Sequence, residues 1–189
     1  MAGKKNDISH QTALELLQEG NTRYMADQTS RPNATPGRRL ETESGQWPFA
    51  IVLTCADSRV TPELVFDQGI GDIFVARVAG NVATSEVIGS IQYAVQYIHT
   101  ELVVVLGHES CGAVNAAISP PDDAPQELGN LVGQIQNAIG PEQTLQKAVE
   151  TNAKAQATEL SKALTGTSMS HAKVCAATYG LSSGEVAWL

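Results

Sequence analysis

The sequence predicts a three-layer α/β/α fold with a mainly parallel central sheet and an N-terminal helical arm. Two apolar runs, 49–53 and 102–106, do not alternate with polar residues. Such runs are typical of strands buried on both faces of a parallel sheet. Segments with helical spacing follow each run. Strands and helices therefore alternate along the chain, which is the pattern of βαβ units.

The first 46 residues predict a helical arm followed by a connection. Residues 9–26 form an amphipathic pattern, and Ser9 is a candidate N-cap. The stretch 28–46 contains two prolines and two glycines and lacks a periodic apolar face, so we expect a long connection. We assign 1–46 to this arm and connection and 47–189 to the α/β part, within one domain overall.

The remaining elements follow from apolar spacing and turn residues. A helix is expected at 84–99, because Thr84 or Ser85 can cap it and apolar residues recur at helical spacing. The other expected elements are strands at 49–54, 72–76, 102–106 and 172–179, turns at 62–66 and 119–125, a helix start at 111–118, helices at 127–139 and 142–164, and an edge strand at 185–189.

The composition excludes several classes of partner. The chain has 189 residues, a net charge of -8 and a pI near 4.9, so most of its surface would repel nucleic acid and anionic membranes. The start carries no apolar leader, and no window approaches the roughly 18 apolar residues of a membrane span. We therefore expect a cytoplasmic protein. Three cysteines without a leader favour reduced thiols or metal ligands over a disulfide framework.

Two short polar strings follow the two buried runs: Cys55-Ala56-Asp57-Ser58-Arg59 and His108-Glu109-Ser110-Cys111. Because ligands bind at the carboxyl ends of the strands in open α/β sheets, we expect Cys55, His108 and Cys111 to converge there. Two thiolates and one imidazole suit a tetrahedral Zn²⁺ site that keeps its fourth position free. Cys111 also stands at a predicted helix N-terminus, where the helix dipole favours the thiolate.

Asp57 and Arg59 are expected to control the fourth position of this site. Asp57 stands two residues after Cys55, and Arg59 two residues after Asp57, so one turn can set the carboxylate beside both the metal and the guanidinium. In the closed arrangement Asp57 binds the metal. In the other, Arg59 holds Asp57 off the metal by a bidentate pair, and Asp57 accepts a hydrogen bond from the water on zinc. This predicts a switch with pH.

Other interpretations of these residues stay open at this point. A buried cysteine is often an inert core residue, and Cys55 and Cys111 could form a thiol-disulfide switch. Arg59 and Arg77 are the only basic residues between Arg39 and Lys147. Each follows an apolar strand, which predicts a buried carboxylate or anion beside each guanidinium.

The chain resembles the bacterial branch of the β-class carbonic anhydrases from about residue 9 onward. Besides the two metal strings, the resemblance lies in ELVFDQGIGDIFVARVAGN at 63–81 and ATYGLSSGEV at 177–186. It implies a zinc-dependent lyase that reversibly hydrates carbon dioxide to bicarbonate and a proton. It also implies that 47–189 is the catalytic part and that the chain forms a homodimer or homotetramer with active sites at subunit interfaces.

The resemblance also implies roles for individual residues. Zinc would be held by Cys55, His108 and Cys111, with Asp57 and Arg59 as the gating pair. The residues implied in substrate binding are Gln46 across the subunit interface, the backbone amide of Gly112, and Phe74 and Ala79 in a small apolar pocket. Val52 stands where some members carry a tryptophan beside an inhibitory bicarbonate, so that pocket is not expected here.

Two rival functions remain at this stage. Some proteins of the same fold hydrolyse carbonyl sulfide or carbon disulfide at a similar zinc, and these substrates are also small, linear and apolar. The other rival is a non-catalytic zinc or redox module, which predicts a closed site with four protein ligands.

Overall fold

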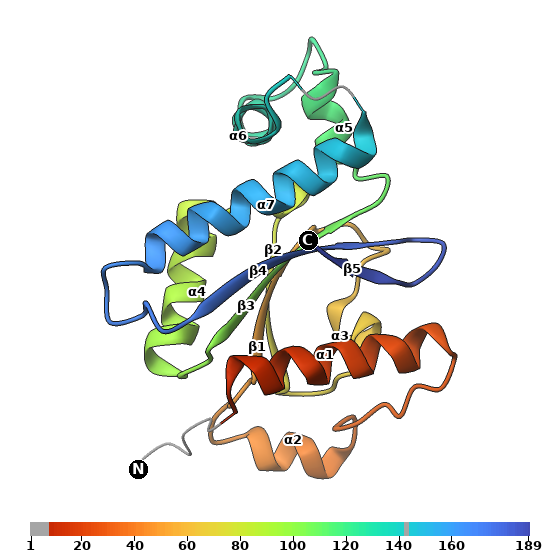
Figure 1. Cartoon of the computed structure of the whole chain (residues 1–189), viewed down its shortest axis with the longest axis vertical. Helices are drawn as coiled ribbons and strands as arrows, with labels where there is room; N and C mark the ends of the chain where they lie inside the picture. The colour runs from red at the N-terminus through yellow and green to blue at the C-terminus, as the bar shows by residue number, and fades with distance from the viewer. Residues whose placement is uncertain (1–7, 142–143) are drawn as a thin grey trace.

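The computed structural model describes residues 8–141 and 144–189. Within these residues a five-stranded sheet, in the order β2-β1-β3-β4-β5, lies between two layers of helices (Figure 1). The first four strands are parallel, and β5 runs antiparallel to β4. The strands are β1 (Ala50–Thr54), β2 (Ile73–Arg77), β3 (Leu102–His108), β4 (Lys173–Tyr179) and β5 (Val186–Trp188). The predicted three-layer α/β/α fold with a mainly parallel sheet is confirmed.

The helices lie on both sides of the sheet (Figure 1). One side carries α4 (Ser85–Tyr97), α5 (Gly112–Ile118), α6 (Gln126–Ile139) and α7 (Leu145–Leu164), and the other carries α1 (His10–Met25), α2 (Pro36–Thr42) and α3 (Pro62–Val65). A short 3-10 turn, η1 (Ala79–Asn81), follows β2. No helix of the described residues combines the length and apolar character needed to cross a bilayer.

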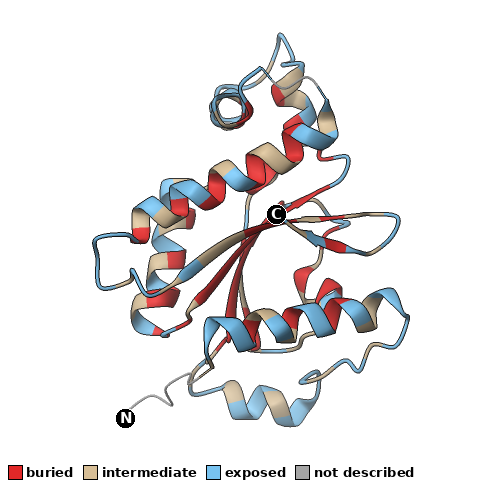
Figure 2. Cartoon of the chain, in the orientation of Figure 1, coloured by how far each residue is buried: buried red, intermediate tan, exposed pale blue. Residues whose placement is uncertain are grey.

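The central strands β1 and β3 are buried along their whole length (Figure 2). Successive side chains of a strand point to opposite faces, and the two cores divide accordingly. Val52 and Val104 pack in the core that includes Ala13 and Leu17 of α1. Their neighbours in the strands belong to the core that includes residues of α4 and α7. Both faces of the sheet are therefore apolar, which explains why the sequence shows continuous runs.

The N-terminal arm forms as predicted, but the connection after it contains a helix that the sequence did not reveal. Ser9 caps α1, since its Oγ accepts a hydrogen bond from the Thr12 amide at 3.2 Å. Helix α2 is capped in the same way by Thr35. Because none of the residues of α2 is buried, the segment has no apolar periodicity, and the sequence predicts only a long connection there.

Smaller differences concern the ends of elements. The predicted turn at 62–66 is the one-turn helix α3, and β2 lies one residue later than expected. Strand β3 continues through Gly107 and His108, because both residues still pair with β4. The predicted start of the last long helix at Glu142 lies outside the described residues, and α7 is seen from Leu145.

A buried carboxylate fastens the arm and the connection to α3. The Asp67 side chain is 2% exposed and accepts a hydrogen bond from Arg23 Nε at 2.6 Å. It also accepts from the amides of Ser30 (3.0 Å) and Arg31 (2.9 Å). Burial opposes ionisation of this carboxyl, but the hydrogen bonds from Arg23, Ser30 and Arg31 outweigh that effect and lower its pKa to about 2.

Asp67→Asn is expected to destabilise the protein by about 2 kcal/mol at pH 7, because the lowered pKa means that folding favours the ionised carboxylate. Asparagine tolerates the left-handed backbone found at Asp67 (φ 47°), so the change tests the charge. The stabilisation is fully present above the unfolded pKa near 4 and is lost as pH falls toward 2. Urea denaturation at pH 7 and pH 3 measures the difference, which should shrink to roughly half at pH 3. Asp122→Asn, at an exposed position, is the control, and equal effects of the two variants would contradict this account.

Candidate metal centre

Three potential metal ligands meet at the carboxyl edge of the sheet. Cys55 directly follows β1, His108 ends the neighbouring strand β3, and Cys111 precedes the first residue of α5. All three are buried, and their ligand atoms lie within 4.8 Å of one another. The two sulfur atoms are 3.9 Å apart. The parallel pairing of β1 with β3 therefore brings together residues that are more than fifty positions apart in the chain.

The histidine has the geometry of a metal ligand. Its Nδ1 lies 2.8 Å from the carbonyl oxygen of Glu109, and this contact assigns the ring proton to Nδ1. Nε2 then carries the lone pair that a metal ion would need. His108 is fully buried, and its Nε2 has no hydrogen-bond partner among the described residues. A buried nitrogen without a partner beside two thiols is what a zinc ion would satisfy, so the site fits Zn²⁺.

The two thiols share a proton in a way that favours one thiolate. A hydrogen bond with Cys111 lowers the pKa of Cys55, against the opposing effect of burial. The same hydrogen bond raises the pKa of Cys111. A cation bound between them would displace the remaining proton, since metals bind thiolates rather than thiols.

The backbone of η1 approaches Cys55 directly. The Gly80 amide donates a hydrogen bond to Cys55 Sγ at 3.3 Å. Gly80 has a left-handed backbone (φ 70°), and a Cβ at this position would collide with Ile135 and press on Ala113 at 3.3 Å. Glycine is therefore favoured here by the conformation, and a larger residue would also have to displace the end of the Ile135 side chain.

Asp57 lies beside the three ligands but is held by Arg59. Arg59 donates from Nε to Asp57 Oδ1 at 2.9 Å and from Nη2 to Asp57 Oδ2 at 2.7 Å, which is a bidentate pair. Asp57 Oδ2 lies 3.9 Å from His108 Nε2. The hydrogen bond from Arg59 holds the pKa of Asp57 far below its usual range, so this carboxylate stays ionised next to the site.

Arg77 has a different role from the one expected. We predicted a buried carboxylate or anion beside it, but the structure places backbone carbonyls there. Its Nε donates to the carbonyl oxygen of Cys55 at 3.2 Å, and its Nη2 to that of Asp57 at 2.7 Å. Arg77 thus braces the loop that carries both residues. Its position directly opposite Thr54 at the end of β2 is the feature that accounts for this contact.

The four residues implied in substrate binding lie in two groups. Ala79 precedes Gly80 in η1, and Gly112 is exposed at the first position of α5, so both are close to the metal ligands. Phe74 lies near the amino end of β2 and packs against the core that includes α4. Gln46 is exposed and precedes the amino end of β1, at the opposite edge of the sheet from Cys55. Within one chain Phe74 and Gln46 are not brought to the ligands.

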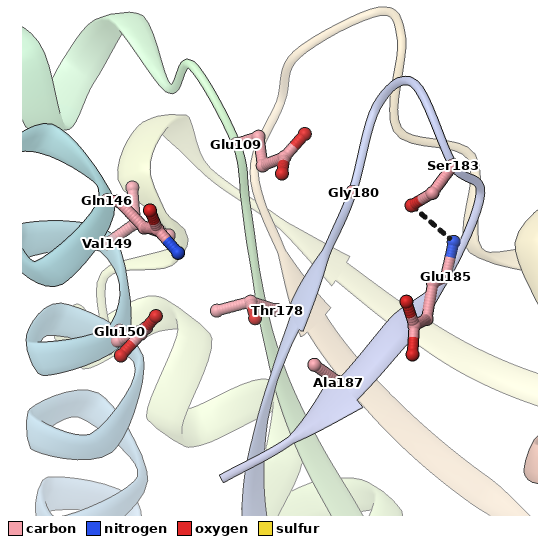
Figure 3. Close-up of a pocket in the computed structure, with 9 residues that line it drawn as sticks. All are labelled: Glu109, Gln146, Val149, Glu150, Thr178, Gly180, Ser183, Glu185 and Ala187. Atoms are coloured by element: carbon pink, nitrogen blue, oxygen red, sulfur yellow. Dashed lines mark hydrogen bonds between the residues drawn. The ribbon is translucent and has the colours of Figure 1, made fainter.

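A separate cavity of about 160 Å³ lies between α7 and the β4–β5 turn (Figure 3). None of the three ligands lines it. Glu109 stands at its edge, where its carboxylate accepts a hydrogen bond from the Leu181 amide at 3.0 Å. Glu109 therefore holds the β4–β5 turn with its side chain and His108 with its backbone carbonyl.

Comparisons with known proteins place this geometry in context. The chain matches the family described as carbonic anhydrase over residues 50–186. It is 45% identical over 129 residues to carbonic anhydrase 2 of Mycobacterium tuberculosis. The aligned residues cover 68% of this chain and 62% of that protein. It is 48% identical over 111 residues to a carbonic anhydrase of Mycolicibacterium smegmatis, covering 59% and 54%. The chain thus matches a little over half of the length of these relatives.

Solved structures share the fold. A Coccomyxa β-carbonic anhydrase in complex with acetazolamide superposes with a TM-score of 0.70 at 20% identity and covers 93% of this chain and 84% of that one. A tetrameric β-carbonic anhydrase from Sordaria macrospora gives a TM-score of 0.66 at 18% identity, covering 93% and 96%.

The three ligands predict a measurable metal stoichiometry. Purified protein should bind one zinc per chain, and Cys55→Ser, His108→Asn and Cys111→Ser should each weaken zinc affinity by at least about 10-fold, because each removes one of three donors. Competition with a chromophoric chelator measures the affinity. Cys175→Ser is the matched control, since Cys175 lies in β4 and is not part of this group. Equal affinity in the Cys55 and Cys175 variants would contradict the assignment.

Proposed function

Because the chain belongs to the β-carbonic anhydrase family, we propose that it catalyses the reversible hydration of carbon dioxide to bicarbonate and a proton. The observation that carries this proposal is the buried group of Cys55, His108 and Cys111 beside an ionised Asp57. The 45–48% identity to mycobacterial proteins named carbonic anhydrases supports it.

Cys55, His108 and Cys111 would hold the zinc ion. When bound, zinc acts as a Lewis acid that lowers the pKa of a coordinated water and so supplies a nucleophile near neutral pH. Glu109 fixes the tautomer and ring orientation of His108 through its backbone carbonyl. Gly80 donates to Cys55 and directs its sulfur atom. These contacts set the ligands in place before a metal binds.

Asp57 and Arg59 would orient the attacking water. An ionised carboxylate accepts hydrogen bonds only, so Asp57 can fix the direction of a water molecule beside the ligands. The bidentate pair and the Arg59 amide, which donates to Asp57 Oδ1 at 2.9 Å, hold this acceptor in one position. In our proposal Arg59 also keeps Asp57 from occupying the fourth ligand position.

The remaining substrate contacts are proposed from the family. The Gly112 amide and Ala79 adjoin the ligands, and they would contact a small linear substrate. Gln46 is separated from Cys55 by strand β1, whose five residues span about 17 Å. It would therefore serve the site of a second copy. Phe74 is proposed to line an apolar pocket in the same assembly.

We also propose that the chain forms a homodimer or homotetramer. Strand β2 is an edge of the sheet, and edge strands of buried parallel sheets are normally covered. Leu64 and Ile70, which precede β2, are 61% and 38% exposed. The Sordaria macrospora relatives are described as tetrameric. On the family resemblance alone, we further propose a cytoplasmic location and a role in carbon utilisation.

Zinc-loaded protein is expected to hydrate carbon dioxide at pH 8.5, and a chelator should abolish the activity. Stopped-flow measurement with a pH indicator follows the released proton. Hydrogen sulfide release from carbonyl sulfide and carbon disulfide is measured on the same sample. We expect little of it, since the relatives are named carbonic anhydrases. Sulfide release without carbon dioxide hydration would overturn the proposal in favour of the hydrolase.

Arg59→Ala is expected to lower kcat/KM for carbon dioxide by about 10-fold to 100-fold, because Asp57 loses the partner that orients it. The kcat/KM of Arg59→Lys should lie between those of the wild type and Arg59→Ala, because a lysine keeps the positive charge but cannot form the bidentate pair. Arg39→Ala, on exposed α2, is the control and should keep wild-type activity. Full activity in Arg59→Ala would show that the pair does not serve catalysis.

A further inference from the structure

The turn η1 that touches Cys55 has an unfavourable backbone conformation. Gly80 and Asn81 adopt positive φ angles in succession, 70° and 47°. Asparagine pays a modest cost for this conformation, and such residues persist where the surrounding structure holds them. The direction of the Gly80 amide toward Cys55 Sγ depends on this turn. Whatever holds the turn therefore also holds the hydrogen bond to the metal ligand.

Two buried amide side chains on α7 hold the turn. Asn152 is fully buried, and Gln156, one helical turn later, is 5% exposed. Asn152 Nδ2 donates to the carbonyl oxygen of Gly80 at 2.8 Å. Gln156 Nε2 donates to Asn152 Oδ1 at 3.0 Å, and Gln156 Oε1 accepts from the Ala83 amide at 2.9 Å. The two amide side chains thus bind the loop at two backbone groups, the Gly80 carbonyl before Asn81 and the Ala83 amide after it.

Burying these two amide side chains in an apolar core disfavours folding unless their polar atoms are hydrogen-bonded. The surrounding residues of α7 are apolar, with Ala153, Ala157 and Leu160 all in the same core. The hydrogen bonds of Asn152 and Gln156 are directed to each other and to the loop.

We infer that Asn152 and Gln156 are positioning residues of the metal centre: by holding the Gly80 carbonyl they fix the backbone conformation of Gly80, so that its N–H, on the preceding peptide unit, donates to Cys55 Sγ. The hydrogen bond withdraws negative charge from the sulfur and sets the direction of its lone pairs. Removing a hydrogen bond to a metal ligand commonly lowers metal affinity or activity by about 10-fold to 100-fold. The link to catalysis rests on the proposed function, whereas the link to the metal site does not.

The test uses the cobalt form of the protein, because cobalt reports on its sulfur ligands by light absorption. Asn152→Leu should move the sulfur-to-cobalt charge-transfer band to lower energy, since a thiolate without its hydrogen bond gives up an electron more easily. The same variant should weaken zinc affinity by about 10-fold. Gln156→Leu removes the support of Asn152 and leaves the Gly80 contact in place, so we expect a smaller shift in the same direction.

Asn21→Leu is the matched control. Asn21 is a buried asparagine on α1 whose Nδ2 donates to the carbonyl oxygens of Val65 and Gly184 and whose Oδ1 accepts from the Val186 amide. Its side chain makes three hydrogen bonds, against two for Asn152, and none of them goes to the loop of Gly80. Asn21→Leu should lower the free energy of unfolding while leaving the cobalt band and the zinc affinity at their wild-type values.

The outcomes separate the hypotheses. If Asn152→Leu and Gln156→Leu keep the wild-type cobalt band, the amides serve only folding and the inference is overturned. Gln156→Leu alone decides the matter if Asn152→Leu does not fold. Should the wild-type protein fail to hydrate carbon dioxide while the cobalt band still shifts in the variants, the proposed reaction would be wrong and the positioning role would stand.

Discussion

The pairing of β1 with β3 is the constraint on which the site depends. The two strands are parallel neighbours in the register Thr54 opposite Leu106, so the residues that follow them emerge at one edge. The Thr54 hydroxyl donates to the Leu106 carbonyl oxygen at 3.0 Å in a buried position. A polar group is tolerated there because it is satisfied. A shift by one residue would reverse the faces of every strand side chain, so the two apolar cores keep the register that brings Cys55 to His108.

Around this register two of the ligands, His108 and Cys55, are oriented directly by backbone groups. His108 is oriented by the Glu109 carbonyl and Cys55 by the Gly80 amide. The loop after Cys55 is held by the Arg77 side chain, which donates to two backbone carbonyl oxygens of that loop. Backbone groups are fixed by the fold, so they lose little freedom when a ligand is oriented. The result is a site whose donors are arranged at the end of a rigid sheet.

Charged side chains also support the site and the fold around it. The chain is acidic overall, yet two of its few arginines stand at the carboxyl edge of the sheet, where Arg59 keeps Asp57 ionised and Arg77 fixes the loop. A second carboxylate, the buried Asp67, has a structural role, and its ion pair with Arg23 connects the arm to the end of α3. The two carboxylates differ in role because Asp67 is enclosed by its donors, whereas Asp57 faces the metal ligands.

The sequence by itself determined the fold class and the identity of the central residues. Continuous apolar runs predict buried parallel strands, and the polar strings after them place Cys55, Asp57, Arg59, His108 and Cys111 at one edge without reference to coordinates. It did not reveal α2, because that helix buries no residue and has no apolar pattern. Nor did it reveal the carbonyl contacts of Arg77 or the amides Asn152 and Gln156. The Arg77 contacts depend on the pairing of β2 with β1, and those of Asn152 and Gln156 depend on how α7 lies against η1. These contacts join residues twenty to more than seventy positions apart and leave no periodic signal in the chain. Only the tertiary structure decided which backbone groups they would meet.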